Sequence, residues 1–114
     1  MSEHERLRIA TRKGADRLIL ELNGELDMVS SDVLQAALVR ADGGTASMVV
    51  LDLGGVSFLD STGLKAIFKA RKAVDARGQQ FAVTPGSAQV QRLLSLTRLD
   101  EHLHTIDTPD ALLA

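Results

Sequence analysis

The residues best suited to chemistry in this chain are Asp60, Ser61 and Thr62, which separate an apolar segment from one with helical spacing. These residue types at a helix start accept hydrogen bonds from backbone N–H groups that lack a partner in the helix. The same N–H groups and the positive end of the helix dipole also favour a phosphate group. The pattern therefore allows two interpretations, helix capping alone or capping together with phosphorylation of Ser61. A phosphoryl group adds about −1.5 to −2 charges, which is large beside a formal net charge of −2.

Catalysis by a serine nucleophile is the main alternative chemistry, and the sequence argues against it. Such a serine needs a base within hydrogen-bond reach, but His4, His102 and His104 fall near the ends of the chain. The chain also has no G-x-S-x-G elbow, no Gly-rich phosphate-binding motif and no cysteine. His102 and His104 could share a metal ion, but no third ligand is indicated. We therefore expect a protein that is not an enzyme and has no metal or cofactor.

Length and composition narrow the classes of function further. A chain of 114 residues fits one domain, so we expect residues 1–114 to form it. The slight negative charge and the presence of only three aromatic residues argue against direct nucleic-acid binding. The first residues are polar, and no apolar run approaches the length of a membrane span. We expect a cytoplasmic protein without a membrane span.

Apolar periodicity predicts the elements that must position these residues. Five segments have strand character: 7–12, 18–22, 48–53, 81–83 and 103–106. Four segments have helix character: 33–41, 61–77, 90–97 and a short one from residue 108. Strands that alternate with helices after an initial hairpin indicate an α/β fold, a mixed sheet of about five strands with three to four helices packed on it.

The glycines and charged residues within these segments allow further predictions about their structural roles. Gly24 and the pair Gly54-Gly55 are expected to end the second and third strands. Asp52 lies inside the apolar third strand, where an unpaired buried charge is costly, so we interpret it as structural and expect it to lie near the end of the strand or to be paired. The lysines at 65, 69 and 72 fall on one face of the second helix and are interpreted as a solvated face.

Several motifs occur in a fixed order along nearly the whole chain. GELD stands at 24–27 after the second strand, VLDL at 50–53, DSTGL at 60–64, and an apolar pattern between Pro85 and Thr97 marks the third helix. In this order the chain resembles the STAS domain as found in bacterial anti-sigma-factor antagonists. Two positions depart from the family pattern, because Lys65 and Arg98 stand where the family usually carries glycine.

The resemblance implies a binding protein that regulates transcription by partner switching, for example in a stress response. It implies that Ser61 is phosphorylated, and that the unphosphorylated chain sequesters an anti-sigma factor that doubles as a serine kinase and thereby releases a sigma factor. A serine phosphatase is a further implied partner. The predicted partner-binding residues are Asp27, Asp60, Ser61, Thr62, Gly63 and Lys65.

Two alternatives stay open at the level of sequence. Asp27 lies between a strand and a helix, where an acidic residue is commonly a cap or turn residue and not a contact. STAS-like domains also serve as soluble subunits of lipid transporters or as parts of stress-signalling assemblies, and in such a role Ser61 need not be phosphorylated.

Overall fold

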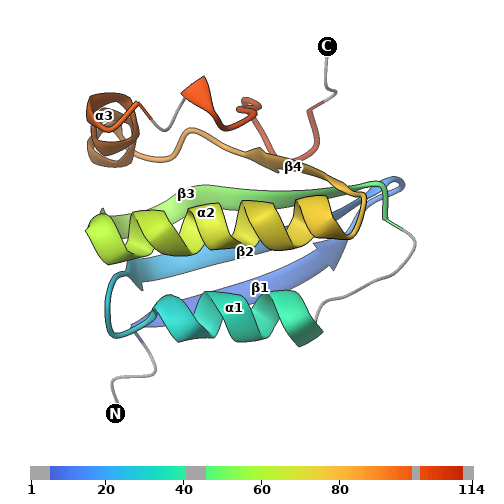
Figure 1. Ribbon diagram of the computed structural model, residues 1–114, viewed down its shortest axis with the longest axis horizontal. Helices are drawn as coiled ribbons and strands as arrows, with labels where there is room; N and C mark the ends of the chain where they lie inside the picture. Colours follow the sequence, from blue (N-terminus) through green and yellow to red (C-terminus); the bar gives the residue numbers. More distant parts are fainter. Residues whose placement is uncertain (1–5, 41–45, 99–100, 112–114) are drawn as a thin grey trace.

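A computed structural model of the chain, shown in Figure 1, describes residues 6–40, 46–98 and 101–111. Its strands and helices, in chain order, are β1 (Leu7–Lys13), β2 (Arg17–Leu26), α1 (Ser31–Arg40), β3 (Met48–Leu59), α2 (Ser61–Ala76), β4 (Gln80–Val83) and α3 (Ala88–Leu96). The sheet order is β1-β2-β3-β4, with β1 antiparallel to β2 and the other pairs parallel. The predicted α/β class and mixed sheet are confirmed.

Helices α1 and α2 lie side by side on one face of the sheet and begin at the same end of it (Figure 1). Alternate residues of β2 and β3 point into this layer, and all are almost fully buried: Leu18, Leu20, Leu22, Val49, Leu51 and Leu53. Residues between them, such as Ile19 and Val50, form a smaller cluster on the other face with Ile106 from the C-terminal segment. Strands β2 and β3 are thus apolar on both faces, as central strands require.

Strands β2 and β3 are both longer than predicted, because the glycines expected to end them lie within the pairing. The two strands stay paired as far as Leu26 and Leu59, with register shifts around residues 21–25. Gly24 has a φ of +121°, and a Cβ atom there would overlap the Arg6 carbonyl oxygen. A Cβ on Gly55 would overlap the Asn23 side chain. These glycines therefore permit close, irregular strand pairing instead of interrupting it.

The C-terminal prediction was wrong, because the described residues form neither a fifth strand nor a fourth helix after α3. Thr105 makes a single parallel bridge with Val83, through backbone hydrogen bonds of 2.8 and 2.9 Å on either side of it. Residues 108–111 form a turn, and residues 112–114 lie outside the described ranges. The physical reason lies with Arg17, which is 5% exposed and donates hydrogen bonds to the carbonyl oxygens of Pro109 and Ala111.

Asp52 is hydrogen-bonded, as the structural interpretation requires. Its Oδ1 accepts from the backbone N–H of Gly54 at 2.9 Å and from the Thr84 hydroxyl at 3.1 Å. The predicted bounds of the first helix run to Ala41, which lies outside the described residues. The other two predicted helices agree with α2 and α3 to within two residues at each end.

Candidate functional site

The GELD and DSTGL motifs meet at one end of the sheet, where β2 and β3 end and α1 and α2 begin (Figure 1). Because β2 and β3 are parallel, their carboxyl ends lie at the same edge. Leu26 pairs with Leu59, so Asp27 and Asp60 follow on neighbouring strands. The structure thus brings together two motifs that are separated by more than 30 residues of sequence.

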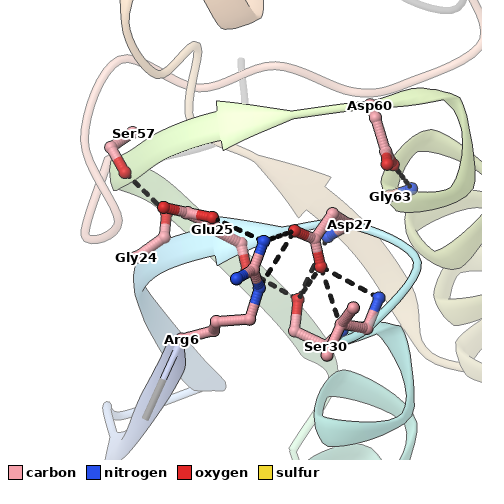
Figure 2. Close-up of polar contacts among 9 residues, drawn as sticks. Arg6, Gly24, Glu25, Asp27, Ser30, Ser57, Asp60 and Gly63 are labelled. Carbon is pink, nitrogen blue, oxygen red and sulfur yellow. Dashed lines mark hydrogen bonds and ion pairs between the residues drawn. The ribbon is translucent and has the colours of Figure 1, made fainter. Parts of the chain in front are cut away.

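Asp60 makes the transition from β3 to α2. Its backbone is extended, with φ of −111° and ψ of −174°, and its Oδ1 accepts a hydrogen bond from the Gly63 N–H at 2.8 Å (Figure 2). Its carbonyl oxygen accepts from the Leu64 N–H at 3.0 Å. Asp60 is therefore the N-cap of α2, and its carboxylate is committed to the first turn of the helix.

Gly63 holds the start of α2 against the end of β2. It is buried, and a Cβ atom at this position would overlap the Leu26 carbonyl oxygen and lie 2.7 Å from a methyl carbon of Leu59. Only glycine allows the helix backbone to approach the strand this closely. The glycine of the DSTGL motif therefore fixes where Ser61 stands relative to the sheet.

Ser61 and Thr62, the first two residues of α2, differ in accessibility. Ser61 is exposed and its side chain makes no hydrogen bond with any described residue. Thr62 is half-buried and lines a groove between α1 and α2. Lys65 follows Ser61 by one helical turn and is exposed. Ser61 is thus the hydroxyl of this turn that a second protein can reach with little rearrangement.

Asp27, in contrast, is 4% exposed and all its carboxylate contacts are internal (Figure 2). Its Oδ2 accepts from Nη2 and Nε of Arg6 at 2.6 and 3.2 Å. Its Oδ1 accepts from the backbone N–H groups of Val29 and Ser30 at 3.0 and 3.1 Å. The Ser30 hydroxyl in turn donates to the Glu25 carbonyl oxygen at 2.6 Å. The carboxylate therefore shapes the turn before α1 and does not face solvent.

These contacts lower the pKa of Asp27. The hydrogen bond from Arg6 is the largest cause, and hydrogen bonds from Ser30 add to it, while burial opposes them. A carboxyl whose pKa is lower in the folded than in the unfolded state stabilises the fold above its unfolded pKa, near 3.9. That contribution is lost as the pH falls through the folded-state pKa.

We expect Asp27→Asn to lower the free energy of unfolding by about 2 kcal/mol at pH 7, because it removes a buried charge-assisted hydrogen bond and offers an amide to Arg6. The difference between wild type and variant should shrink as the pH falls below the unfolded-state pKa near 3.9, and it should vanish only below the lower folded-state pKa of Asp27. Urea unfolding at pH 7 and pH 3 measures the difference in the free energy of unfolding between wild type and variant at each pH. Glu25→Gln is the matched control, since Glu25 contacts the same arginine at 2.9 Å but is half-exposed, and it should change stability by less than about 1 kcal/mol. Equal losses in the two variants would contradict this account.

Comparison with known proteins agrees with this arrangement. The family model of the STAS domain matches residues 6–112, nearly the whole chain. This chain belongs to the STAS domain family. It is similar to the anti-sigma F factor antagonist of Paenibacillus polymyxa, with 34% identity over 83 residues that cover 72% of this chain and 71% of that protein.

Other relatives of this STAS domain have similar names. The anti-sigma-F factor antagonist RsfB of Mycobacterium tuberculosis is 30% identical over 92 residues, which are 79% of this chain and 73% of that protein. The crystal structure of an anti-sigma factor antagonist from Mycobacterium paratuberculosis has a TM-score of 0.81 and covers 96% of this chain and 93% of that chain. Its sequence identity of 24% makes this a likeness of fold alone.

Exposed apolar side chains around the site of this STAS domain were missed by sequence reasoning. Met28 is 73% exposed and Val29 is 57% exposed, and both stand on the turn that Asp27 shapes. Phe58, paired in register with Glu25, is 41% exposed. A signal was available, because turns between a strand and a helix are usually polar, and Met28-Val29 interrupts that pattern.

His102 and His104 do not belong to this site. His102 and His104 line a pocket with Arg71 and Asp75 near the C-terminal end of α2, the opposite end from Ser61. His4 lies outside the described residues. Within residues 6–40, 46–98 and 101–111, no group of three or more His, Cys, Asp or Glu side chains could hold a metal ion. Among the helices described, none has the length and apolar character needed to cross a bilayer.

Proposed function

We propose that this STAS domain is an anti-sigma-factor antagonist, and that phosphorylation of Ser61 switches its binding. The observation that carries the proposal is the exposed Ser61 hydroxyl, which has no hydrogen-bond partner among the described residues, at the meeting point of the two family motifs. The relatives named as anti-sigma-F factor antagonists support the same partner class. In its unphosphorylated form, the domain binds an anti-sigma factor and thereby frees a sigma factor in the cytoplasm.

The phosphorylation step belongs to the partner, and the domain is its substrate. A serine kinase transfers the γ-phosphoryl group of ATP to Ser61 Oγ, which loses its proton, and ADP departs as the leaving group. The N-terminus of α2 tolerates the product, because its free backbone N–H groups and helix dipole favour an anion there. A serine phosphatase restores the hydroxyl by hydrolysis. The chain itself contributes position and exposure and needs no catalytic group.

The other predicted partner-binding residues have distinct roles in this proposal. Asp60 and Gly63 fix the helix start that presents Ser61. Thr62 and Lys65 lie beside Ser61 on the surface of the first turns of α2. Asp27 acts indirectly, since its carboxylate orients the turn that carries Met28 and Val29. Those apolar side chains and Ser61 together form a surface on which a partner protein can bury area.

Release of a sigma factor tests the proposal directly. The anti-sigma factor and sigma factor from the same genome are combined as a complex, and the purified domain is titrated in while free sigma factor is measured by size-exclusion chromatography. We expect wild type and Ser61→Ala to displace the sigma factor. Incubation with ATP should stop wild type from doing so, but not Ser61→Ala, and mass spectrometry should locate the phosphate on Ser61. Absence of displacement by any form of the domain would refute the proposal.

Lys65 gives a smaller, local prediction for the phosphorylated form. A lysine four residues after Ser61 on a helix is within reach of its phosphate, and a nearby cation favours the dianion. Two charges about 5 Å apart in water interact by roughly 0.8 kcal/mol per unit charge, so the second pKa of the phosphate should fall by about half a unit. Phosphorus NMR titration of wild type and Lys65→Gln at low salt measures the difference. Identical titration curves would show that Lys65 points into solvent.

A further inference from the structure

Ser61 stands at the head of a row of exposed cations on α2. Lys65, Lys69 and Lys72 follow it at intervals of four, four and three residues, and each is exposed. Residues with this spacing share one face of an α-helix. At 1.5 Å per residue, the row extends about 16 Å from Ser61. We call residues 65, 69 and 72 the lysine row.

The charges of the lysine row are not balanced within the described chain. None of its three side chains makes an ion pair with a described residue, whereas nearby Arg71 pairs with Asp75 at 3.6 Å. Helices α1 and α2 together carry five basic and two acidic residues, a net charge of +3. The whole chain has a net charge of −2. Positive charge is therefore concentrated on the helical layer that presents Ser61, against the sign of the molecule as a whole.

A groove between α1 and α2 runs beside the lysine row. It is lined by Ser31, Asp32 and Gln35 of α1 and by Thr62, Lys65 and Lys69 of α2. The Gln35 amide donates to the Ala66 carbonyl oxygen at 3.2 Å and so joins the two helices there. Asp32 is the acidic side chain in this lining. An anionic ligand would therefore contact the α2 side of the groove and be repelled from the α1 side.

We propose that the lysine row is a docking surface for an acidic segment of the protein that recognises Ser61. This proposal rests on the proposed function, because it extends the same contact along α2. A protein segment fits better than a membrane, since α2 has no large exposed apolar side chain that could enter lipid. It also fits better than a nucleic acid, since no aromatic side chain on which a base could stack lines the groove.

The lysine row also gives Ser61 phosphorylation a second effect. A phosphate on Ser61 lies one helical turn from Lys65, which can pair with it. An acidic partner segment then meets an added negative charge and loses the free cation nearest to the switch. Phosphorylation thus competes with the partner for part of its docking surface, besides occupying space at Ser61.

Two probes test the lysine row independently of each other. The first is a fluorescein-labelled peptide of eight glutamates, titrated at 20 mM salt and followed by fluorescence anisotropy. The second is the anti-sigma factor from the same genome, followed by surface plasmon resonance over a range of salt concentrations. The test variant carries Lys65→Gln, Lys69→Gln and Lys72→Gln together. The matched control removes three exposed cations from other elements, through Arg8→Gln, Lys13→Gln and Arg92→Gln. Circular dichroism melts establish that each variant is folded.

We expect the lysine-row variant to bind both probes at least tenfold more weakly, since each exposed pair contributes up to about fivefold. Its association rate with the anti-sigma factor should fall and lose much of its salt dependence. The control variant should remain within about threefold of wild type. Asp32→Asn should strengthen peptide binding about twofold, an effect that misfolding cannot produce.

The outcomes separate the two proposals. An equal loss of affinity in the lysine-row variant and the control would overturn the proposal that the lysine row is a docking surface. The proposed antagonist function would stand in that case if the anti-sigma factor still binds wild type. Binding of the peptide without binding of the anti-sigma factor would support the lysine row and refute the proposed function. Vesicles with 30% phosphatidylserine serve as an additional control. If they bind the domain and the peptide does not, the proposal is overturned in favour of a membrane surface.

Discussion

The phosphorylated domain is expected to bind the anti-sigma factor about 30- to 1000-fold more weakly than the unmodified domain, which is a loss of roughly 2–4 kcal/mol of binding free energy. The reason is the position of Ser61, an exposed residue at the sheet edge where β2 and β3 end, the edge at which the exposed Met28 and Val29 follow β2. A partner that contacts this surface must desolvate a group with about −1.5 to −2 charges. The fold itself should survive, because the phosphate sits at the favourable end of the α2 dipole.

Isothermal titration calorimetry with the purified anti-sigma factor measures this loss. Ser61→Ala should bind within about threefold of wild type, since it removes a hydroxyl that has no partner among the described residues. Ser61→Asp should bind more weakly than wild type but more tightly than the phosphorylated form, because it carries one charge and not nearly two. Thr62→Ala controls for a change beside the serine and should keep the full effect of phosphorylation. Equal affinities of the phosphorylated and unmodified forms would mean that Ser61 is not a switch.

The sequence was sufficient to predict the elements that carry Ser61. The capping residues at 60–62 and the apolar spacing behind them are local signals, and α2 begins at Ser61 as they indicate. The ends of the strands were harder to predict, because Gly24 and Gly55 in the sequence indicate that a strand ends there. What decides their role is the close approach of a neighbouring segment, the Arg6 carbonyl oxygen at Gly24 and the Asn23 side chain at Gly55, which leaves no room for a Cβ atom. Such an approach leaves no mark in the local pattern.

The role of Asp27 depended on a partner that sequence spacing does not reveal. Arg6 lies 21 residues before it and reaches it only because β1 and β2 are antiparallel. The family resemblance implies that Asp27 belongs to the docking surface, and this stays a prediction; the structure adds that its buried carboxylate supports the neighbouring turn. The C-terminal error has a similar origin, because Arg17, more than 90 residues earlier in the sequence, binds the carbonyl oxygens of Pro109 and Ala111 and ties this segment to the start of β2.

Gly63→Ala is expected to destabilise the domain by about 3 kcal/mol, although the residue lies in a helix. Helix propensity alone would predict the opposite, a gain of about 1 kcal/mol for alanine over glycine. The added methyl group, however, overlaps the Leu26 carbonyl oxygen and approaches the Leu59 side chain. Relief requires α2 to move away from the ends of β2 and β3, and such overpacking costs about 1–3 kcal/mol or more when backbone must shift. The sign of the change therefore distinguishes the two effects.

Thermal melts decide the sign, with a melting temperature lowered by roughly 10–15 °C as the expected result. Gly54→Ala is the matched control, because a Cβ there meets only the Asp52 carboxylate, at 3.1 Å, and it should change stability by less than about 1 kcal/mol. The folded fraction of Gly63→Ala should also be phosphorylated more slowly by the cognate kinase, since moving α2 displaces Ser61 from its position at the sheet edge. A melting temperature at or above that of wild type would show that the end of β2 shifts to accommodate the added methyl group at little cost. In that case Gly63 would not fix the position of Ser61.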